Sequence, residues 1–508
     1  MVDIREPLKD EVKDAVVVGA GFGGLGAALG LVEHGARVVV CETLRYAGGC
    51  ASTFTKDGYA FDAGATLLSG LGESQLFGRW QRQYALGVDV EWLDPLVELR
   101  TPSFRLAVPR ERDALVARFA ALPGAPTRAR ALSAFFATQR KVADALWPLF
   151  DDPSLLPPFD LRALARHARR GPEYLALLGL VGKPLTEVVA AHGLLGFEPL
   201  RVYLDAVCQI TVQCSAAVAE APFALAALDY FFRGTGHVKG GVGVLATALA
   251  RVLTARGAEV HFSNAVQAVT RAEDGLFHVR TRRGVIRARA VVANVLPRAL
   301  ERLLGTPLPA PTSRLAAEVE GGWGAAMLYL GARVAEGVPR GAHHLELVAD
   351  TSQPFERGNH LFVSLSGADE GRAPAGQRAI TVSTHVPLPP ARGRGEDAQG
   401  MRARMEAVTA SMQATLAALA PEVWEARMHV LTASPRTFAR FTGRPLGAVG
   451  GVPRRAGLAA YGGVGPHLVD SGLWLVGDSV FPGQSALAAA IGGLRTAESV
   501  ARALNEAA

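Results

Sequence analysis

The chain has 508 residues, of which 49% are hydrophobic and 20% charged, and two domains are the simplest expectation for this length. Its net charge of +6 comes from arginines scattered through the chain, without an aromatic-interleaved basic module, which argues against a nucleic-acid partner. The four cysteines lack C-x-x-C pairing or any other familiar ligand spacing, which argues against a metal site or a disulfide framework.

The N-terminus and the hydropathy pattern indicate where in the cell the protein is expected. Residues 1–14, MVDIREPLKDEVKD, are charged where a signal peptide needs an apolar core, and no window reaches eighteen uninterrupted apolar residues. We therefore expect a cytoplasmic protein. A basic and rather apolar chain suits a peripheral position on the cytoplasmic face of an anionic membrane.

A βαβ unit is predicted near the N-terminus. The β-branched run DAVVV, residues 14–18, breaks at Gly19, as a buried parallel strand does before a tight turn. A helix follows with Gly35 at its C-terminal end, and RVVVC, residues 37–41, is the second strand. One face of this helix carries Leu25, Ala28, Leu29 and Val32 at helical spacing.

The glycines of this unit match a dinucleotide-binding fingerprint. Gly19, Gly21 and Gly24 have the G-x-G-x-x-G spacing, which also recurs two residues later, so the position between strand and helix selects the first register. The first two glycines would let the backbone approach a pyrophosphate, and the third would let the helix pack closely on the strand. Glu42, at the end of the second strand, can accept hydrogen bonds from ribose hydroxyls, and its charge disfavours NADP.

The middle of the chain, from about residue 115 to residue 230, is mostly helical by pattern, with proline breaks. Within it, the segment LRALARHARRGPEYLALLGLVGKPL is basic first and apolar afterwards, with arginines before residue 171 and leucines after residue 174. Such a segment suits a membrane interface, with arginines at lipid phosphates and leucines among acyl chains. An ordinary helix pair with a solvated face explains the same pattern.

Alternating α and β elements resume after the helical region. A glycine turn, an amphipathic helix at 245–253, a strand at 260–262 and another strand at 290–293 follow in order. Strand-like runs between 323 and 385 predict an antiparallel sheet. A mixed-charge loop, PPARGRGEDAQG, precedes a helix at about 401–420, and the tail predicts a strand ending at Gly477 and Asp478, a loop and a long helix.

Three distant segments together resemble the FAD-binding signature of the carotenoid desaturase family, which includes carotenoid cis–trans isomerases and retinol saturases. The first is the fingerprint with GGCASTF, residues 48–54; the second is FDAGATLLSG, residues 61–70. The third is LVGDSVFPGQS, residues 475–485, preceded by PRTFARFTGRPLGAVGG, residues 435–451. Their order and match extend across nearly the whole chain.

The resemblance implies an α/β fold of the amine-oxidase and phytoene-desaturase type. A Rossmann-like FAD-binding domain would comprise residues 14–110, 235–310 and 430–508. A discontinuous substrate domain of antiparallel sheet plus helices would comprise 111–234 and 311–429, with a membrane-associating helical part at about 115–230.

The resemblance also assigns cofactor-binding roles. Val266 would clasp the adenine, Asp478 would hold a ribityl or ribose hydroxyl, and the helix beginning near Ser485 would direct its N–H groups at the flavin pyrimidine. A helix N-terminus there would stabilise the negative charge of reduced flavin. The full set of implied FAD-binding residues is Gly19, Ala20, Gly21, Gly23, Gly24, Glu42, Gly48, Gly49, Cys50, Ser52, Val266, Ala293, Gly477, Asp478, Ser485 and Ala486.

Two features depart from bacterial phytoene desaturases. Cys50 replaces the arginine that tends to follow the paired glycines, and GDSVFPGQ lacks the usual alanine-glycine pair. Both are more similar to the isomerase and saturase branch or to later-acting desaturases, so the direction of the reaction stays open.

The leading hypothesis is an FAD-dependent desaturase acting on a carotenoid or another long apolar isoprenoid, with hydride passing to flavin N5. The catalytic residue is not established; Glu220 and His237 are candidates for the base. Alternatives are a redox-neutral cis–trans isomerase, a polyene saturase, an amine oxidase and a non-catalytic lipid carrier. Because only one dinucleotide fingerprint is present, electrons would leave to an external acceptor such as oxygen or a quinone.

Overall fold

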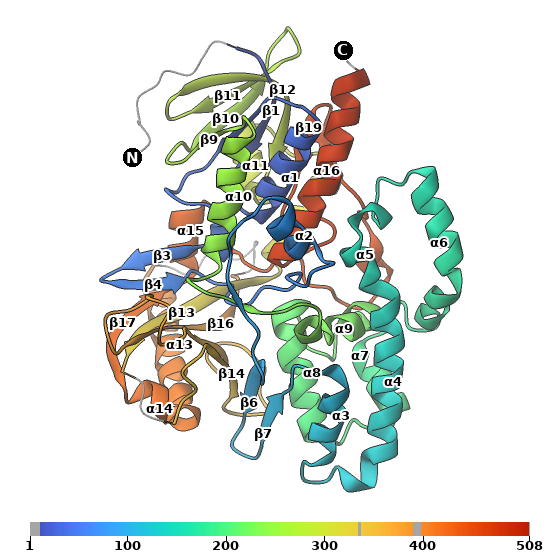
Figure 1. Ribbon diagram of the computed structural model, residues 1–508, viewed down its shortest axis with the longest axis vertical. Coiled ribbons are helices and arrows are strands. Elements are labelled where there is room, and N and C mark those ends of the chain that lie inside the picture. Colours follow the sequence, from blue (N-terminus) through green and yellow to red (C-terminus); the bar gives the residue numbers. More distant parts are fainter. Residues whose placement is uncertain (1–10, 334–336, 390–397, 507–508) are drawn as a thin grey trace.

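The computed structural model describes residues 11–333, 337–389 and 398–506 (Figure 1). The first ten residues and most of the mixed-charge loop before residue 398 lie outside this part of the chain. The described residues form two large β-sheets and a mainly helical region, and each is built from segments that are far apart in the sequence.

The first sheet contains the predicted βαβ unit. Five of its strands run parallel, in the order β9 (Glu259–His261), β2 (Val38–Cys41), β1 (Lys13–Val18), β12 (Gly284–Ala293) and β19 (Leu473–Leu475). Antiparallel strands β11 (Phe277–Thr281), β10 (Val266–Arg271) and β18 (His467–Asp470) extend it. Alternate residues of β1 enter two different hydrophobic cores, which explains its uninterrupted apolar sequence.

Helices cover both faces of this sheet. On one face, α1 (Phe22–Glu33) packs against α16 (Ala486–Glu506) and α10 (Gly243–Ala255), as Figure 1 shows. The other face is covered by α11 (Pro297–Leu304), beside which lies α12 (Ala310–Glu320). The predicted helices of the βαβ unit and of the C-terminus are therefore confirmed.

Glycines bring α1 and α16 into very close contact. A Cβ atom on Gly26 would lie 2.3 Å from the carbonyl oxygen of Ala490, and one on Gly493 would lie 2.0 Å from that of Gly23. The second G-x-G-x-x-G register is thus explained by helix packing, because Gly23 and Gly26 lie on the face of α1 that meets α16.

The second sheet has seven strands. Its order is β17 (Arg427–Ala433), β13 (Trp323–Ala332), β16 (Arg378–Pro387), β15 (His360–Leu365), β14 (His343–Val348), β6 (Val97–Arg100) and β7 (Arg105–Val108). All neighbouring strands are antiparallel except β14 and β6. Helix α13 (Ala398–Leu419) and the short α14 (Pro421–Trp424) pack on one face.

This sheet corrects one predicted domain boundary. Strands β6 and β7 lie within residues 14–110, which the sequence assigned to the cofactor domain, yet they belong to the second sheet, whose other strands lie mainly in the range predicted for the substrate domain. The first cofactor segment therefore ends before β6. It includes the hairpin β3 (Thr53–Lys56) and β4 (Tyr59–Asp62) and helix α2 (Leu76–Gln83).

The region between 112 and 232 is helical, as predicted. Its helices are α3 (Arg112–Ala120), α4 (Ala129–Leu146), α5 (Pro148–Asp151), α6 (Leu161–Tyr174), α7 (Leu185–Ala191), α8 (Glu198–Thr211) and α9 (Ala221–Ala227). Helix α6 lies at the edge of the molecule in Figure 1, and Ala163 is its one buried residue. Among the described residues, no helix is both long and apolar enough to cross a membrane.

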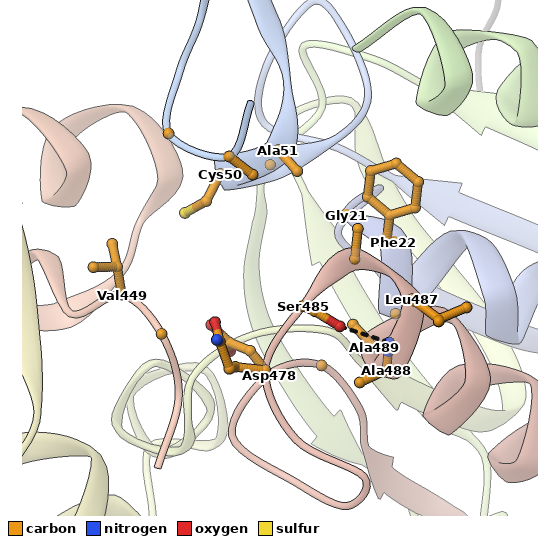
Figure 2. Close-up of a pocket in the computed structure, with 18 of the residues that line it drawn as sticks. Gly21, Phe22, Cys50, Ala51, Val449, Asp478, Ser485, Leu487, Ala488 and Ala489 are labelled. Atoms are coloured by element: carbon orange, nitrogen blue, oxygen red, sulfur yellow. Dashed lines mark hydrogen bonds between the residues drawn. The ribbon is translucent and has the colours of Figure 1, made fainter. Parts of the chain in front are cut away.

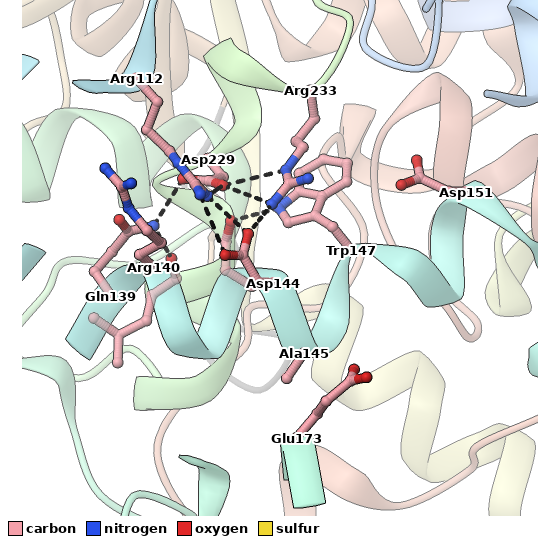
Figure 3. A network of polar contacts seen from close by, with 12 residues as sticks. Arg112, Gln139, Arg140, Asp144, Ala145, Trp147, Asp151, Glu173, Asp229 and Arg233 are labelled. Carbon is pink, nitrogen blue, oxygen red and sulfur yellow. Dashed lines mark hydrogen bonds and ion pairs between the residues drawn. The ribbon is translucent and has the colours of Figure 1, made fainter. Parts of the chain in front are cut away.

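A buried polar network holds α4 against its neighbours (Figure 3). Asp229 is fully buried and accepts hydrogen bonds from Gln139 at 2.9 Å and from Arg233 at 3.2 Å. At the end of α4, the Trp147 indole donates to the carbonyl of Ala226 at 2.8 Å. These contacts fix the position of Trp147, which lines a cavity between the helical region and the two sheets.

Candidate functional site

A cavity of about 680 Å³ is lined by parts of both sheets and of the helical region. Figure 2 shows one part of it, where Gly21 and Phe22 at the start of α1, Cys50 and Ala51, Val449, Asp478 and the start of α16 surround a common space. The segments that carry the sequence motifs therefore meet at one place. Two further walls come from α4, α8 and α9 and from the cavity-facing residues of β13 and β16.

The predicted nucleotide end of the cavity is formed by the βαβ unit. Glu42 is buried, and its carboxylate accepts hydrogen bonds from the backbone N–H groups of Ala20 at 2.7 Å and Leu44 at 2.8 Å. Burial raises the pKa of Glu42. Each carboxylate oxygen can accept a second hydrogen bond, so Glu42 can also bind ribose hydroxyls at the cavity that it lines.

Glycines allow the backbone to approach closely at the start of α1. Gly19 has a φ of +96°, and a Cβ atom on Gly24 would lie 2.0 Å from the carbonyl oxygen of Gly19. The Gly48 N–H donates to the carbonyl of Ala20 at 2.8 Å and joins the two glycine-rich loops. This geometry matches the tight turn and close helix packing that a pyrophosphate site requires.

Asn294 is a site residue that the sequence analysis missed. It follows β12 and lines the cavity, and its side chain occupies the space that Cβ atoms on Gly21 and Gly23 would need. Ala293, which was expected to line the cofactor, is instead fully buried in the sheet. Ser52 is also buried outside the cavity lining, and Ala20 contributes through its N–H bond to Glu42.

The predicted flavin end lies at the start of α16. Ser485 has a φ of +105°, unusual for a residue with a side chain, and its Oγ accepts a hydrogen bond from the Ala488 N–H at 3.0 Å. Ser485, Ala486 and the next residues of α16 line the cavity, so the positive end of the helix dipole lies at the cavity.

Asp478 has a partner that the sequence analysis did not identify. The Arg444 guanidinium donates to the Asp478 carboxylate at 2.6 Å, and both residues line the cavity. Although burial opposes the charge on Arg444, Asp478 raises its pKa. Cys50 also lines the cavity, and burial raises the pKa of its thiol. Arg444 lies within the motif at 435–451. The motif indicated that this region belongs to the site, but it did not identify Arg444 as the partner of Asp478.

The remaining part of the cavity is mainly apolar. Its lining includes Leu146, Trp147, Leu149, Phe150, Leu156, Ile210, Phe223, Met327, Phe362, Phe438, Val452, Phe481 and Leu487. His385, Gln213 and Arg454 supply polar atoms there, and sequence analysis identified none of the three. The Arg454 guanidinium lies over the Phe223 ring at 5.6 Å and donates to the carbonyl of Pro482 at 3.0 Å.

Neither proposed catalytic base reaches this cavity. Glu220 is fully buried and accepts hydrogen bonds from the Gly182 and Gly457 N–H groups and from the Tyr461 hydroxyl. Glu220 therefore links the loop that contains Gly182 to the loop that contains Gly457. His237 is also fully buried and lies 2.9 Å from Glu370, outside the cavity lining. Both assignments are wrong, because tertiary contacts direct these side chains elsewhere.

The family model for flavin-containing amine oxidoreductases matches residues 22–500. The chain belongs to this family. It is 27% identical to the chloroplastic prolycopene isomerase of Arabidopsis thaliana over 511 aligned positions, covering 97% of this chain and 83% of that protein. It is also 27% identical to the neurosporene-forming phytoene desaturase of Cereibacter sphaeroides over 296 positions, 55% of this chain and 52% of that protein. An oxidoreductase structure from Methanosarcina mazei has the same fold, with a TM-score of 0.62, 18% identity and coverage of 96% of this chain and 100% of that one.

The resemblance to carotenoid desaturases and isomerases and the expected flavoprotein fold are therefore confirmed. The chain is an FAD-dependent oxidoreductase, and the residues present fit the cofactor. The close-packed turn at Gly19, the carboxylate of Glu42 and the N-terminus of α16 lie along one cavity. They would hold the pyrophosphate, ribose and flavin parts of FAD, respectively.

Proposed function

We propose that this flavoenzyme acts on carbon–carbon bonds of a long apolar polyene, most simply a carotenoid. The main support for this proposal is the apolar part of the cavity, where α4, α5 and α9 contribute aliphatic and aromatic side chains. The names of the isomerase and desaturase relatives support the same substrate class. A polyene has no charge to bind, so shape and exclusion of water would orient it.

The carboxylates argue against an amine substrate. Among the described residues that line the cavity, the carboxylates are Glu42 and Asp478. Glu42 is bound to backbone N–H groups and Asp478 to Arg444, so neither is placed as a free counter-ion for a substrate ammonium. Hydrogen peroxide release with simple amines would contradict this conclusion.

The protein groups have three tasks in this function. Bound FAD supplies two-electron chemistry by accepting a hydride from carbon. The N-terminus of α16 stabilises negative charge in its vicinity, and Arg444 neutralises Asp478 beside it. Trp147 and the other apolar side chains keep water from the reacting carbons.

Desaturation is the main proposal, and cis–trans isomerisation is the second candidate. The observation that favours isomerisation is the match to prolycopene isomerase along 97% of this chain, against 55% for the desaturase. An isomerase would start from reduced flavin and leave its redox state unchanged. A desaturase would pass its electrons on to an external acceptor such as oxygen or a quinone.

An anaerobic absorbance experiment tests the function. The purified FAD-loaded protein would be mixed with liposomes that contain phytoene-class and partly unsaturated carotenoids. We expect the flavin band to bleach while the polyene spectrum shifts to longer wavelength, and readmission of oxygen or a quinone to restore the flavin. If the flavin stays oxidised and the polyene is unchanged, desaturation is excluded for these substrates, and dithionite-reduced enzyme then tests isomerisation.

We also propose that the protein docks on an anionic membrane through an apolar surface patch around α6. The patch consists of Phe159, Leu161, Leu164, Leu175, Leu178 and Val181, with exposed fractions from 40% to 85%. Arg162 and Arg169 on the same helix can meet lipid phosphates. Leu156, which lines the cavity, lies just before the patch in the chain, so a lipid substrate could pass from the acyl region to the cavity.

Vesicle sedimentation tests this docking surface. With vesicles of phosphatidylcholine and phosphatidylglycerol, the double variant Leu161→Glu, Leu178→Glu should lose most of its binding, because two charges enter the acyl region. Leu195→Glu is the matched control, since Leu195 is 53% exposed but lies outside the patch. Equal binding of both variants, or no binding of the wild type, would contradict the proposal. Unchanged FAD content would show that the fold is intact.

A further inference from the structure

Gln213 is held in a strained conformation at the wall of the cavity. Its φ is +62°, in the left-handed region that side chains disfavour, and it is only 4% exposed. The Trp323 indole donates to its carbonyl at 2.6 Å, and its side-chain amide donates to the Ile210 carbonyl at 3.3 Å. A Cβ atom on Gly450 would lie 2.2 Å from its Oε1, so glycine leaves the space this side chain needs. Strained backbone conformations persist only where surrounding contacts hold them in place, and they are frequent at functional sites.

The fixed group of Gln213 is its Oε1, which lies 3.2 Å from Nε2 of His385. Because the amide nitrogen is engaged by Ile210, Oε1 accepts a hydrogen bond from Nε2–H of His385. The lone pair of the imidazole is therefore on Nδ1. Burial lowers the pKa of His385 to about 3, so the free imidazole is neutral at pH 7.

Other titratable side chains of the cavity are engaged elsewhere or remain protonated. Asp478 is paired with Arg444, and Glu42 is bound to backbone N–H groups at the nucleotide end. The Tyr230 hydroxyl donates to a carbonyl, and burial raises the pKa of both Tyr230 and the Cys50 thiol. Among the described lining residues, His385 is thus the neutral base on the substrate side.

We propose that His385 is the catalytic proton acceptor of this enzyme and that Gln213 positions it. The proposal rests on the polyene-oxidoreductase function above. In desaturation, one carbon loses a hydride with two electrons, which bound FAD takes up. The neighbouring C–H bond breaks, its electron pair forms the new C=C bond, and its proton binds Nδ1 of His385.

A buried pair of titratable side chains on the same face of the second sheet would receive this proton next. The β15–β16 register pairs Phe362 with Ser383, and its continuation by two residues places His360 opposite His385. Its Nε2 lies 3.8 Å from Oε1 of Glu346. His360 and Glu346 are at most 1% exposed, and their nitrogen and carboxylate atoms have no hydrogen-bond partner among the described residues. Buried polar groups without a hydrogen-bond partner call for an explanation. Transfer of the proton from His385 to His360 and Glu346 would provide one.

Anaerobic flavin reduction tests the assignment of His385. In His385→Gln we expect the rate with a polyene to fall by about 100-fold or more, the usual contribution of a general base. His278→Gln, on β11 of the other sheet, is the matched control and should keep the wild-type rate. FAD content should be normal in both. In His385→Gly, added imidazole should restore part of the rate, which a purely structural role would not allow.

A measurement without substrate or FAD tests the geometry independently. In FAD-free protein with ¹⁵N-labelled histidine, the resonance lost in His385→Gln should show a protonated Nε2 and a bare Nδ1. A proton on Nδ1 would overturn the assignment. If the wild type reduces its flavin and His385→Gln is equally fast, His385 is not the base although the proposed function stands. If no polyene reduces the wild type, the proposed function fails, and the tautomer alone then decides on the positioning of His385.

Discussion

Arg444 and Asp478 form the clearest charge pair of the cavity at the scale of single residues. Their side chains are 16% and 23% exposed, and removal of one partner leaves the other charge in a poorly solvated place. We expect Arg444→Met to weaken FAD binding and to reduce the free energy of unfolding of the FAD-free protein by about 1–3 kcal/mol.

Equilibrium dialysis of FAD and urea unfolding measure these two effects. Arg436→Met is the control, because Arg436 lies on α15 (Pro435–Thr442), the helix just before Arg444, but is exposed. It should leave both quantities unchanged. If Arg444→Met binds FAD as tightly as the wild type, the pair has only a structural role in the FAD-free protein.

The same residues show how far the sequence defines the site. Gly19, Gly21 and Glu42 could be predicted because a short local segment, strand to turn to helix to strand, determines their relative positions. Gln213 and His385 could not, because Gln213 lies just after α8 and His385 lies on β16, and the two meet only when the helical region packs on the second sheet. A single glutamine or histidine carries no local pattern that reports such a contact.

The packing of α1 on α16 is the critical contact at the scale of elements. Both helices begin at the cavity, so their spacing decides where the two N-termini lie relative to FAD. A Cβ atom on Gly26 would lie 2.3 Å from the backbone oxygen of Ala490, and neither backbone can yield locally. We expect Gly26→Ala to reduce the free energy of unfolding by about 1–3 kcal/mol and to lower the fraction of protein that retains FAD.

Thermal unfolding and the ratio of flavin to protein absorbance measure this outcome. Gly171→Ala is the matched control, because Gly171 also lies within a helix but a Cβ atom there meets nothing within 4 Å. That variant should be as stable as the wild type or slightly more stable, since alanine favours helix. Equal melting temperatures for Gly26→Ala and the wild type would show that the two helices can separate freely.

Elements were predicted well where their hydrophobic period was strong and their length sufficient. The ten-residue strand β13 and the 21-residue helix α16 are examples. Strands β6 and β7 have only four residues each, and nothing in so short a run states which sheet it joins. Their sheet is decided by distant pairing, such as that of Leu345 with Glu98, which explains the misplaced domain boundary.

At the scale of the whole molecule, the cavity combines contributions that no single domain contains. The first sheet and α16 supply the cofactor side, whereas the second sheet and the helices α4, α8 and α9 supply the substrate side. Glu220 joins the loop that follows the apolar surface patch to the loop at 457–461, so its buried carboxylate supports the surface that we propose meets the membrane.

Buried neutral histidines make the whole fold sensitive to acid. Burial lowers the pKa of His385 to about 3 and also lowers the pKa values of His344, His343 and His467, whereas in the unfolded chain a histidine titrates near 6.5. Between these values the unfolded chain binds more protons than the folded one, so the free energy of unfolding decreases as the pH falls below about 6.5. Each such histidine contributes up to about 1.4 kcal/mol per pH unit. Urea unfolding of FAD-free protein at several pH values between 7.5 and 4.5 should therefore show a smaller pH dependence in His385→Gln, by up to one proton. Parallel curves for His385→Gln and the wild type would mean that His385 protonates equally in the folded and unfolded chain, and its neutral form could not then be a property of the cavity.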